Sequence, residues 1–362
     1  MIRLEKRTMI PTWVRFATPV VAIAITVVLG GIIFALLGYD ALKALSMFFL
    51  TPLSRGDQIA DLFVKACPLI IIGTGLVFCY RANIWNIGAE GQLVLGALGA
   101  GWVALSYPEA SSYAILVPMA LAAMAAGALW ALIPAFLRVR FSTNEILVSL
   151  MLTYVASLLI DWLVRGPWRD PMSFGFPLTP LYADAALIPP VILPGIGRLG
   201  QLHWGVPFAL LIAIIGGLIL RHTLAGYQVR LFGEAPRAAK FAGFKPGFVT
   251  IAVMMVSGAL AGLAGAVEVS ANIGQLQPNI SFGFGFTAII VAFLARLNPG
   301  AVIIAGLVVA LAELGGDSAQ IALGIPKVVT GLFKGLLLFM LLAGETWTNY
   351  KISFVRPMKD NA

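Results

Sequence analysis

The chain has few charged residues for its length. Asp, Glu, Lys and Arg make up 11% of its 362 residues, whereas apolar residues make up 60%. Soluble domains carry about a quarter charged residues, so most of this chain is excluded from contact with water. It has only two cysteines, Cys67 and Cys79, and two histidines, His203 and His222. These small numbers argue against a disulfide framework or a metal site, and they favour buried structural thiols.

Two sequence patterns are also missing. The chain has no G-x-x-x-x-G-K-[ST] motif, so we do not expect it to bind ATP through a P-loop. The alternation of apolar and polar residues that a membrane β-barrel requires is absent. Apolar runs of about 18 or more residues instead recur from end to end, and each can cross a bilayer as a helix. Because lipid cannot satisfy backbone polar groups, the sequence predicts an all-α polytopic membrane protein.

The apolar runs predict about ten transmembrane helices in a single transmembrane domain, 1–362. Most of the 24 Lys and Arg residues then lie on one side, which the positive-inside rule assigns to the cytoplasm together with both termini. The net charge of +8 therefore requires no nucleic acid. The expected spans are 17–38, 58–80, 86–106, 113–137, 146–163, 205–221, 248–270, 283–297, 299–313 and 325–343, of which 283–297 and 299–313 could instead form one re-entrant unit.

Two connections are longer than a simple turn requires: an extracytoplasmic loop at 164–204 and a cytoplasmic stretch containing 232–245. The cytoplasmic stretch predicts a short helix, because Pro236 suits a first helical turn and Gly243 suits a C-terminal cap. Its small residues recur at helical spacing beside two cations, a surface that would fit closely in a groove of another protein. The alternative is a helix that only orders the loop. The predicted contact residues are Glu234, Ala235, Pro236, Arg237, Ala238, Ala239, Lys240, Ala242 and Gly243.

Polar residues interrupt the apolar sequence between Asn83 and Gln92. If this segment is helical, Asn83, Asn86 and Glu90 share one face. Alternatively Asn86 caps a helix that begins here, and Glu90 lies in its first turn, where the helix dipole favours a carboxylate. Polar groups at a glycine-broken helix start form solute sites in transporters, whereas capping and close helix packing would be a purely structural explanation. The expected substrate-pathway residues are Asn83, Asn86, Glu90 and Gln92.

Two further segments carry local signals. Ser142, Thr143, Asn144 and Glu145 fit a capping box before an apolar run. Phenylalanines at 282, 284 and 286 alternate with glycines, and their rings could stack on a flat solute such as a nucleobase. Packing at the membrane interface explains these rings equally well. The aromatic candidates for the pathway are Phe282, Phe284 and Phe286.

Charged residues inside predicted spans require partners or a function. Asp61 and Lys65 stand four residues apart, so we expect them to neutralise each other on one helix. Lys334 lies near the middle of a predicted span and is expected to face the interior of the bundle. Contact with a solute is an open alternative for this lysine.

Several strings in the sequence together resemble the permease subunits of bacterial ABC importers for nucleosides and simple sugars. The similarity is greatest to the longer of the two permeases in nucleoside importers of the basic-membrane-protein type. Two positions depart from the family pattern: Ala235, where Asn is expected, and Lys334, where a neutral polar residue is expected. The matching strings are Asn86–Gln92, Thr143–Ile146, Gly166–Pro171, Gly233–Gly243, Gly285–Ile289 and Leu342–Glu345.

The resemblance implies a function and a set of partners. The 232–245 segment would be the coupling helix that docks on a cytoplasmic ABC ATPase, and the 164–204 loop would meet an extracytoplasmic substrate-binding lipoprotein. A second permease subunit, expected to be a paralogue, would complete the path in the lipid of the bacterial inner membrane, and Asn144 would join the pathway residues. The chain itself would be no enzyme and bind no cofactor, because ATP and Mg²⁺ would belong to the ATPase. Transport would occur by alternating access.

Other functions remain open at the level of sequence. A simple-sugar ABC importer permease has the same features. A proton-coupled secondary transporter would use Asp61, Glu90, Glu268 or Glu313 as a relay, but it would not explain the capped cytoplasmic helix. An intramembrane enzyme is disfavoured, because the sequence shows no serine–histidine or metal constellation.

Overall fold

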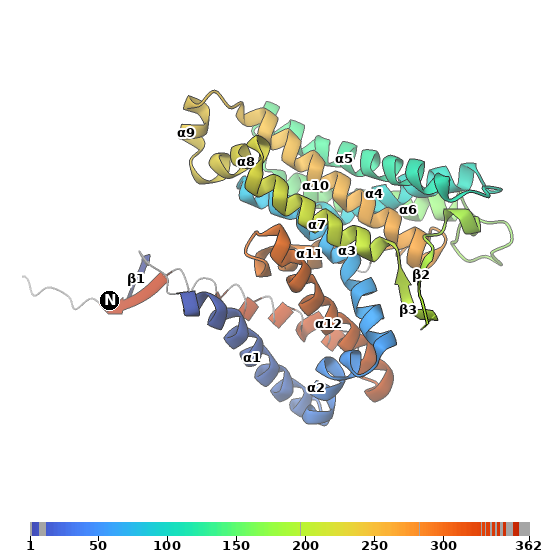
Figure 1. Cartoon of the computed structure of the whole chain (residues 1–362), viewed down its shortest axis with the longest axis horizontal. Helices are drawn as coiled ribbons and strands as arrows, with labels where there is room; N and C mark the ends of the chain where they lie inside the picture. Colours follow the sequence, from blue (N-terminus) through green and yellow to red (C-terminus); the bar gives the residue numbers. More distant parts are fainter. Residues whose placement is uncertain are drawn as a thin grey trace, which may run out of the picture. The chain divides into compact units, whose positions relative to one another are not determined.

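The computed structural model describes residues 2–6, 12–195, 197–281, 283–326, 328–329, 331–333, 335–336, 339–340, 343–344 and 350–354. These residues are mostly helical (Figure 1). The chain divides into two compact units, the first formed by Met1–Ser54 with Leu311–Ala362 and the second by Arg55–Ala310.

The first unit is held together by aromatic packing. It contains α1 (Thr12–Leu36), α2 (Ala41–Phe49), η1 (Thr51–Leu53) and the end of α12 (Pro299–Leu323), and its strands β1 (Ile2–Lys6) and β4 (Tyr350–Phe354) pair antiparallel. The Phe48 ring lies 5.5 Å from Phe34 and 5.1 Å from Phe333, centroid to centroid. The Asp40 carboxylate caps α2 by accepting from the N–H groups of Leu42 and Lys43.

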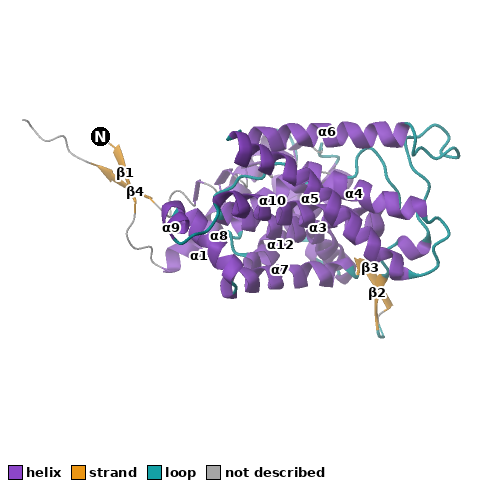
Figure 2. Cartoon of the chain, turned by 90° about the horizontal axis from the view of Figure 1, so that it is seen from above, coloured by secondary structure: helices purple, strands orange, loops and turns teal. Residues whose placement is uncertain are grey.

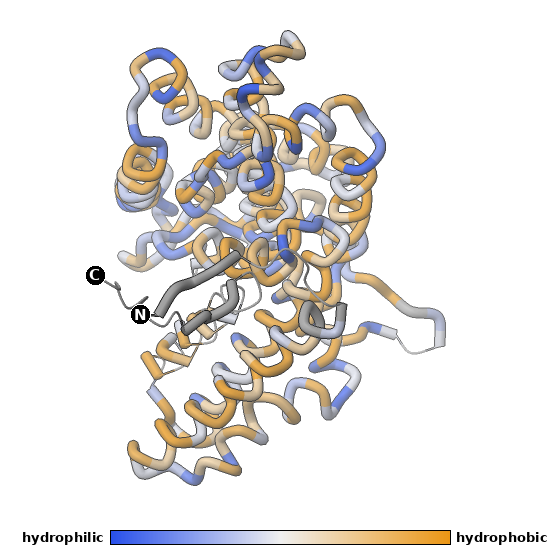
Figure 3. Tube along the Cα trace, turned by 90° about the vertical axis from the view of Figure 1, so that its left-hand side faces the viewer, coloured by the Kyte–Doolittle hydropathy of each residue, from blue (hydrophilic) through white to orange (hydrophobic). Residues whose placement is uncertain are grey.

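The second unit is a bundle whose helices run side by side, with its connecting segments at the two ends (Figures 1 and 2). The short helices α8 and α9 lie at one end, and the β2–β3 hairpin lies at the other. Figure 3 shows apolar residues along most of the helical trace. The elements of the second unit are α3 (Gly56–Arg81), α4 (Ala89–Ser106), η2 (Tyr113–Ile115), α5 (Leu116–Phe141), α6 (Glu145–Arg165), η3 (Asp184–Ala186), β2 (Pro190–Leu193), β3 (Gly197–His203), α7 (Gly205–His222), α8 (Leu224–Glu234), α9 (Pro236–Phe241), α10 (Pro246–Val267), the π-helical turn η4 (Glu268–Ile273), α11 (Phe284–Leu294) and the start of α12.

Glycines allow α4, α5 and α10 to approach each other closely. A Cβ built on Gly262 of α10 would overlap the carbonyl of Ala123 on α5, and a Cβ on Gly127 of α5 would overlap the carbonyl of Gly258. Gly96 of α4 abuts the backbone of Gly262 in the same way. Small residues at such spacings are how helices pack in membranes, where van der Waals contact replaces the hydrophobic effect.

Among the residues that the structure describes, six helical segments are long and apolar enough to cross a membrane: Gly56–Arg81, Tyr113–Phe141, Glu145–Arg165, Gly205–His222, Pro246–Ile273 and Pro299–Leu323. Each of these segments contains or overlaps a predicted span. The span predicted at 299–313 is too short, because the helix continues to Leu323. The span predicted at 283–297 corresponds to α11, whose 11 residues reach only about 16 Å at 1.5 Å per residue. The count of ten spans and the location of the termini stay predictions, and 325–343 falls largely outside the described residues.

Candidate functional site

The Asn83–Gln92 segment is a turn followed by a helix. Asn83 adopts a left-handed conformation (φ 55°) after α3 ends, and no helix forms again until Ala89. The interpretation that places Asn83, Asn86 and Glu90 on one helical face is therefore wrong, and Asn83 is exposed while the other two are buried. Glu90 does lie in the first turn of α4, as the alternative predicted.

The buried Asn86 side chain organises this turn. Its Nδ2 donates to Gln92 Oε1 (2.9 Å) and to Ser257 Oγ (3.0 Å). Its Oδ1 accepts from Gln92 Nε2 (3.0 Å) and from the backbone N–H of Gly88 (3.1 Å). A side-chain amide has two donors and two acceptor lone pairs, so all four positions are filled. In this conformation Asn86 and Gln92 therefore hold the turn, α4 and α10 together.

Glu90 joins α4 to the start of α11, which lies almost two hundred residues away in the sequence. Its two carboxylate oxygens accept from the backbone N–H groups of Gly283 (3.1 Å) and Gly285 (2.6 Å). The first N–H groups of a helix have no partner within the helix, and a carboxylate there also complements the helix dipole. Gly285 is required because a Cβ would overlap the Glu90 backbone. Glu90 thus caps a helix too short to cross the bilayer.

The close packing expected around this turn is present. A Cβ on Gly88 would come within 2.9 Å of Ser149, and one on Gly91 would come within 2.8 Å of Thr153 Cα. Both glycines therefore allow the start of α4 to lie against α6. The packing that the structural alternative predicted is confirmed. The predicted cap is wrong, because the N-cap of α4 is Gly88, with no side-chain cap hydrogen bond.

The candidate phenylalanines do not form one surface. Phe284 is buried, with Lys65 Nζ 5.7 Å from its ring centroid, whereas Phe286 is 40% exposed. Residues two apart point in different directions on a helix, and α11 begins at Phe284. Phe282 lies outside the described residues. Asp61 Oδ1 accepts from the backbone N–H of Gln201 (2.9 Å), and the expected pairing of Asp61 with Lys65 stays a prediction.

A second aromatic cluster, which the sequence analysis missed, lies beside the same turn. The Phe293 ring of α11 lies 5.1 Å from Tyr80 and 5.8 Å from Trp85, centroid to centroid. Arg81 Nε donates to the carbonyl of Leu297 (2.8 Å) and so holds the turn between α11 and α12. The only sequence signal was that Trp85 lies within the polar segment and that Tyr80 lies just before it.

Asn144 caps α6, although the predicted capping box named the wrong residue. Its Oδ1 accepts from the N–H of Ile146 (2.9 Å). Ser142 instead adopts a left-handed conformation (φ 55°) that ends α5, so it cannot cap the next helix. Glu145 pairs with Arg138 and accepts from the N–H of Trp85 (3.4 Å), which ties α5 and α6 to the polar turn.

The predicted helix within 232–245 is α9. Pro236 is its first residue, and Gly243 follows it with φ 81°. The N–H of Phe244 donates to Ala239 O, and that of Gly243 donates to Lys240 O, which is a Schellman motif. Ala239 is buried, so the small-residue stripe is not one free face as the sequence analysis assumed. Ala238 and Ala242 are exposed beside Arg237 and Lys240, and Phe241 is 93% exposed. Helix α8, which precedes α9, was not predicted.

The long loop after α6 is attached to η4, which follows α10, and to the residues just after η4. Backbone N–H groups of Thr179, Tyr182 and Ile188 donate to carbonyls of Leu276, Gly274 and Ser270. The loop ends in the β2–β3 hairpin at His203, whose Nδ1 accepts from the N–H of Gly205 (3.1 Å). Burial lowers the pKa of His203 to about 4, which keeps the ring neutral near pH 7.

Long apolar helices with their connecting segments at opposite ends (Figure 2) define a multi-pass membrane protein. The chain belongs to the family described as the branched-chain amino acid transport system / permease component, whose model matches residues 58–342. It is a permease subunit of an ABC transporter.

Three curated relatives illustrate the similarity. The glucose ABC transporter permease protein TsgB13 of Haloferax volcanii is 33% identical over 99% of this chain and 96% of its own length. The guanosine ABC transporter permease protein NupP of Bacillus subtilis is 28% identical over 93% of this chain and 94% of its own length. The guanosine ABC transporter permease protein NupQ of the same organism is 28% identical over 78% of this chain and 89% of its own length.

Proposed function

We propose that this permease imports a nucleoside across a bacterial inner membrane by alternating access. The observation that carries the proposal is continuous similarity to a guanosine permease over almost the whole chain. A simple sugar is the second candidate, because a glucose permease matches at higher identity. Competition separates the two: excess unlabelled guanosine should suppress uptake of a labelled nucleoside, and excess glucose should not.

The proposed import requires three partners. A second permease, expected to be a paralogue, would complete the path, since two guanosine permeases of one organism both match this chain. A cytoplasmic ABC ATPase would hold ATP and Mg²⁺, so this chain would bind no cofactor itself. A substrate-binding lipoprotein would dock on the long loop. The opposite placement of α9 and the loop suits partners on opposite sides of the membrane.

Helix α9 is the proposed ATPase contact. Its exposed surface combines an aromatic side chain, Phe241, with the cations Arg237 and Lys240, and aromatic and arginine side chains are the usual anchors of interfaces. Phe241→Asp is expected to lower solute-stimulated ATP hydrolysis by the reconstituted complex at least tenfold. The reason is that the substitution puts a carboxylate where an apolar anchor is buried on docking.

Tyr107→Asp provides a matched control, since Tyr107 is also an exposed aromatic residue but follows α4 rather than lying on α9. This variant should hydrolyse ATP at the normal rate. A Phe241→Asp complex that assembles with full stimulation would show that α9 is not the coupling contact.

The sidedness of the loop can be tested by thiol labelling. Ser173 is unsuitable, because it is buried and its hydroxyl oxygen lies 2.8 Å from the carbonyl oxygens of both Asp170 and Phe176, one of which accepts its proton. The neighbouring Phe174 is 96% exposed. In a chain lacking Cys67 and Cys79, Phe174→Cys should react rapidly with an impermeant maleimide added outside cells, and Ser173→Cys should react much more slowly. Reaction of Phe174→Cys only with maleimide added from the cytoplasmic side would contradict the proposed topology.

A further inference from the structure

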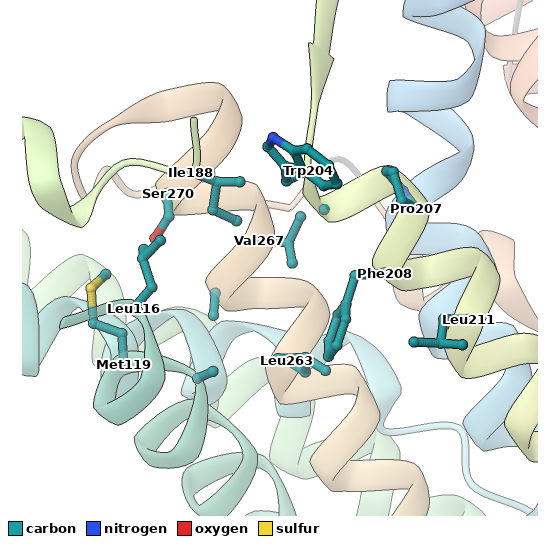
Figure 4. A pocket seen from close by; sticks show the side chains of 13 residues that line it. Leu116, Met119, Ile188, Trp204, Pro207, Phe208, Leu211, Leu263, Val267 and Ser270 are labelled. Carbon is teal, nitrogen blue, oxygen red and sulfur yellow. The ribbon is translucent and has the colours of Figure 1, made fainter. Parts of the chain in front are cut away.

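An apolar cavity of about 500 Å³ lies between α5, α7 and α10, at the end of the bundle where the long loop attaches (Figure 4). One wall is formed by the start of α7, from its N-cap residue Trp204 to Leu211, a length of about 10 Å. In the most apolar stretch of the spans that contain α5 and α7, only 28% and 33% of the residues are buried within the chain, so much of their surface is free to contact lipid or a partner subunit. The apolar cavity is therefore accessible to lipid, and its walls are almost entirely hydrocarbon, with Met119, Phe208 and Leu263 prominent.

A second, polar cavity of about 320 Å³ adjoins the first. The two share Ile188 and Ser270 as lining residues. Ser270 lies in the π-helical turn η4, which widens the helix where the two cavities meet. The polar cavity is also lined by Asp184 and Arg198. Both are exposed, and neither forms an ion pair with another residue that the structure describes.

We propose that the two cavities form one binding site for a membrane phospholipid with a zwitterionic, ethanolamine-type headgroup. An acyl chain fills the apolar cavity, the phosphate binds the Arg198 guanidinium, and the ammonium binds the Asp184 carboxylate. A sugar or nucleoside does not suit the apolar cavity, because its hydroxyls would be buried without partners. An anionic lipid would satisfy Arg198 but would place its net negative charge beside Asp184. The Arg198 cation and the Asp184 anion together complement the phosphate and the ammonium of a zwitterionic headgroup.

Photocrosslinking tests the apolar half. The full-length chain is reconstituted into vesicles of phosphatidylethanolamine and phosphatidylglycerol that contain phosphatidylethanolamine with a diazirine in its acyl chain, and labelled residues are mapped by mass spectrometry. Labelling should concentrate on cavity residues such as Met119, Phe208 and Leu211. Ala120→Trp fills the cavity and should lower this labelling at least fivefold. Leu121→Trp, one residue further and outside the lining, should leave it unchanged.

The headgroup half is tested by native mass spectrometry after release from vesicles with equal amounts of both lipids. The wild-type chain should retain phosphatidylethanolamine, and Arg198→Gln and Asp184→Asn should each lower the retained fraction severalfold. Arg55→Gln, which removes a surface cation paired with Asp57, is the charge control and should have no effect.

If Ala120→Trp does not fold, Leu211→Trp fills the same cavity from α7. Even labelling over all membrane-facing positions, insensitivity to both tryptophans, or preferential retention of phosphatidylglycerol would overturn the proposal.

Discussion

Glu90→Ala is expected to abolish uptake and to lower the amount of folded permease strongly. The substitution removes the acceptor for the N–H groups of Gly283 and Gly285 at the start of α11. A buried donor left without a partner costs about 1–3 kcal/mol, so two such donors destabilise the start of α11 by several kcal/mol. The measurement is the thermal unfolding midpoint of the purified chain, together with uptake corrected for folded protein.

Glu90→Gln provides the comparison that separates a structural role from a solute-binding one. The amide keeps one acceptor oxygen, so its unfolding midpoint should lie between those of the wild type and Glu90→Ala. We propose that solute reaches Glu90 only when α11 moves away, because both carboxylate oxygens accept from the start of α11 in this conformation. Asn86 would become available only if it also released Gln92 and Ser257. Uptake per amount of folded protein should then be much lower for Glu90→Gln than for the wild type. If uptake per amount of folded protein equals that of the wild type, Glu90 has the capping role alone.

Gly262→Ala is expected to destabilise the bundle by about 2 kcal/mol or more. The new methyl group would overlap the Ala123 carbonyl and lie 3.2 Å from Gly127 Cα, so α5 and α10 would have to separate. Overpacking of this kind typically costs about 1–3 kcal/mol. The unfolding midpoint in detergent should therefore fall by several degrees, and uptake should fall with it.

Gly217→Ala is the matched control, since Gly217 also lies within a membrane-spanning helix. Its nearest atom to a new Cβ would be the backbone N of Gly300 at 3.7 Å, which is ordinary contact. Alanine is favoured over glycine in a helix by about 1 kcal/mol, so this variant should be as stable as the wild type or more so. Equal stability of the Gly262 and Gly217 variants would contradict the close packing described for α5 and α10.

The parts of the fold that depend on local sequence could be predicted. Long apolar runs identified the spanning helices, because hydrophobicity and helix length are read within one segment. Pro236 and Gly243 marked the ends of α9, because the conformational limits of proline and glycine act locally. Ser142 and Asn144 show the limit of such signals. Either residue can cap a helix, and the left-handed conformation that ends α5 at Ser142 decides between them.

The contacts that define the candidate site could not be predicted from local sequence. The polarity of the Asn83–Gln92 segment identified it as unusual, but the partners of Glu90 lie near residue 284 and the partner of Asn86 on α10 is Ser257. Only the tertiary fold brings these segments together. The burial of Ala239 has the same origin, because a helical repeat of small residues does not reveal which of them face the chain itself.

We propose that this permease moves solute only when a partner ATPase hydrolyses ATP. The most direct measurement is uptake of a labelled nucleoside into proteoliposomes that contain the assembled permease–ATPase complex with its binding protein, with ATP and Mg²⁺ on the ATPase side. Uptake should require hydrolysable ATP, should be lost with a non-hydrolysable analogue, and should be unaffected when an imposed pH gradient is collapsed. Uptake driven by the pH gradient in the absence of ATP would contradict the account and would favour a proton-coupled transporter.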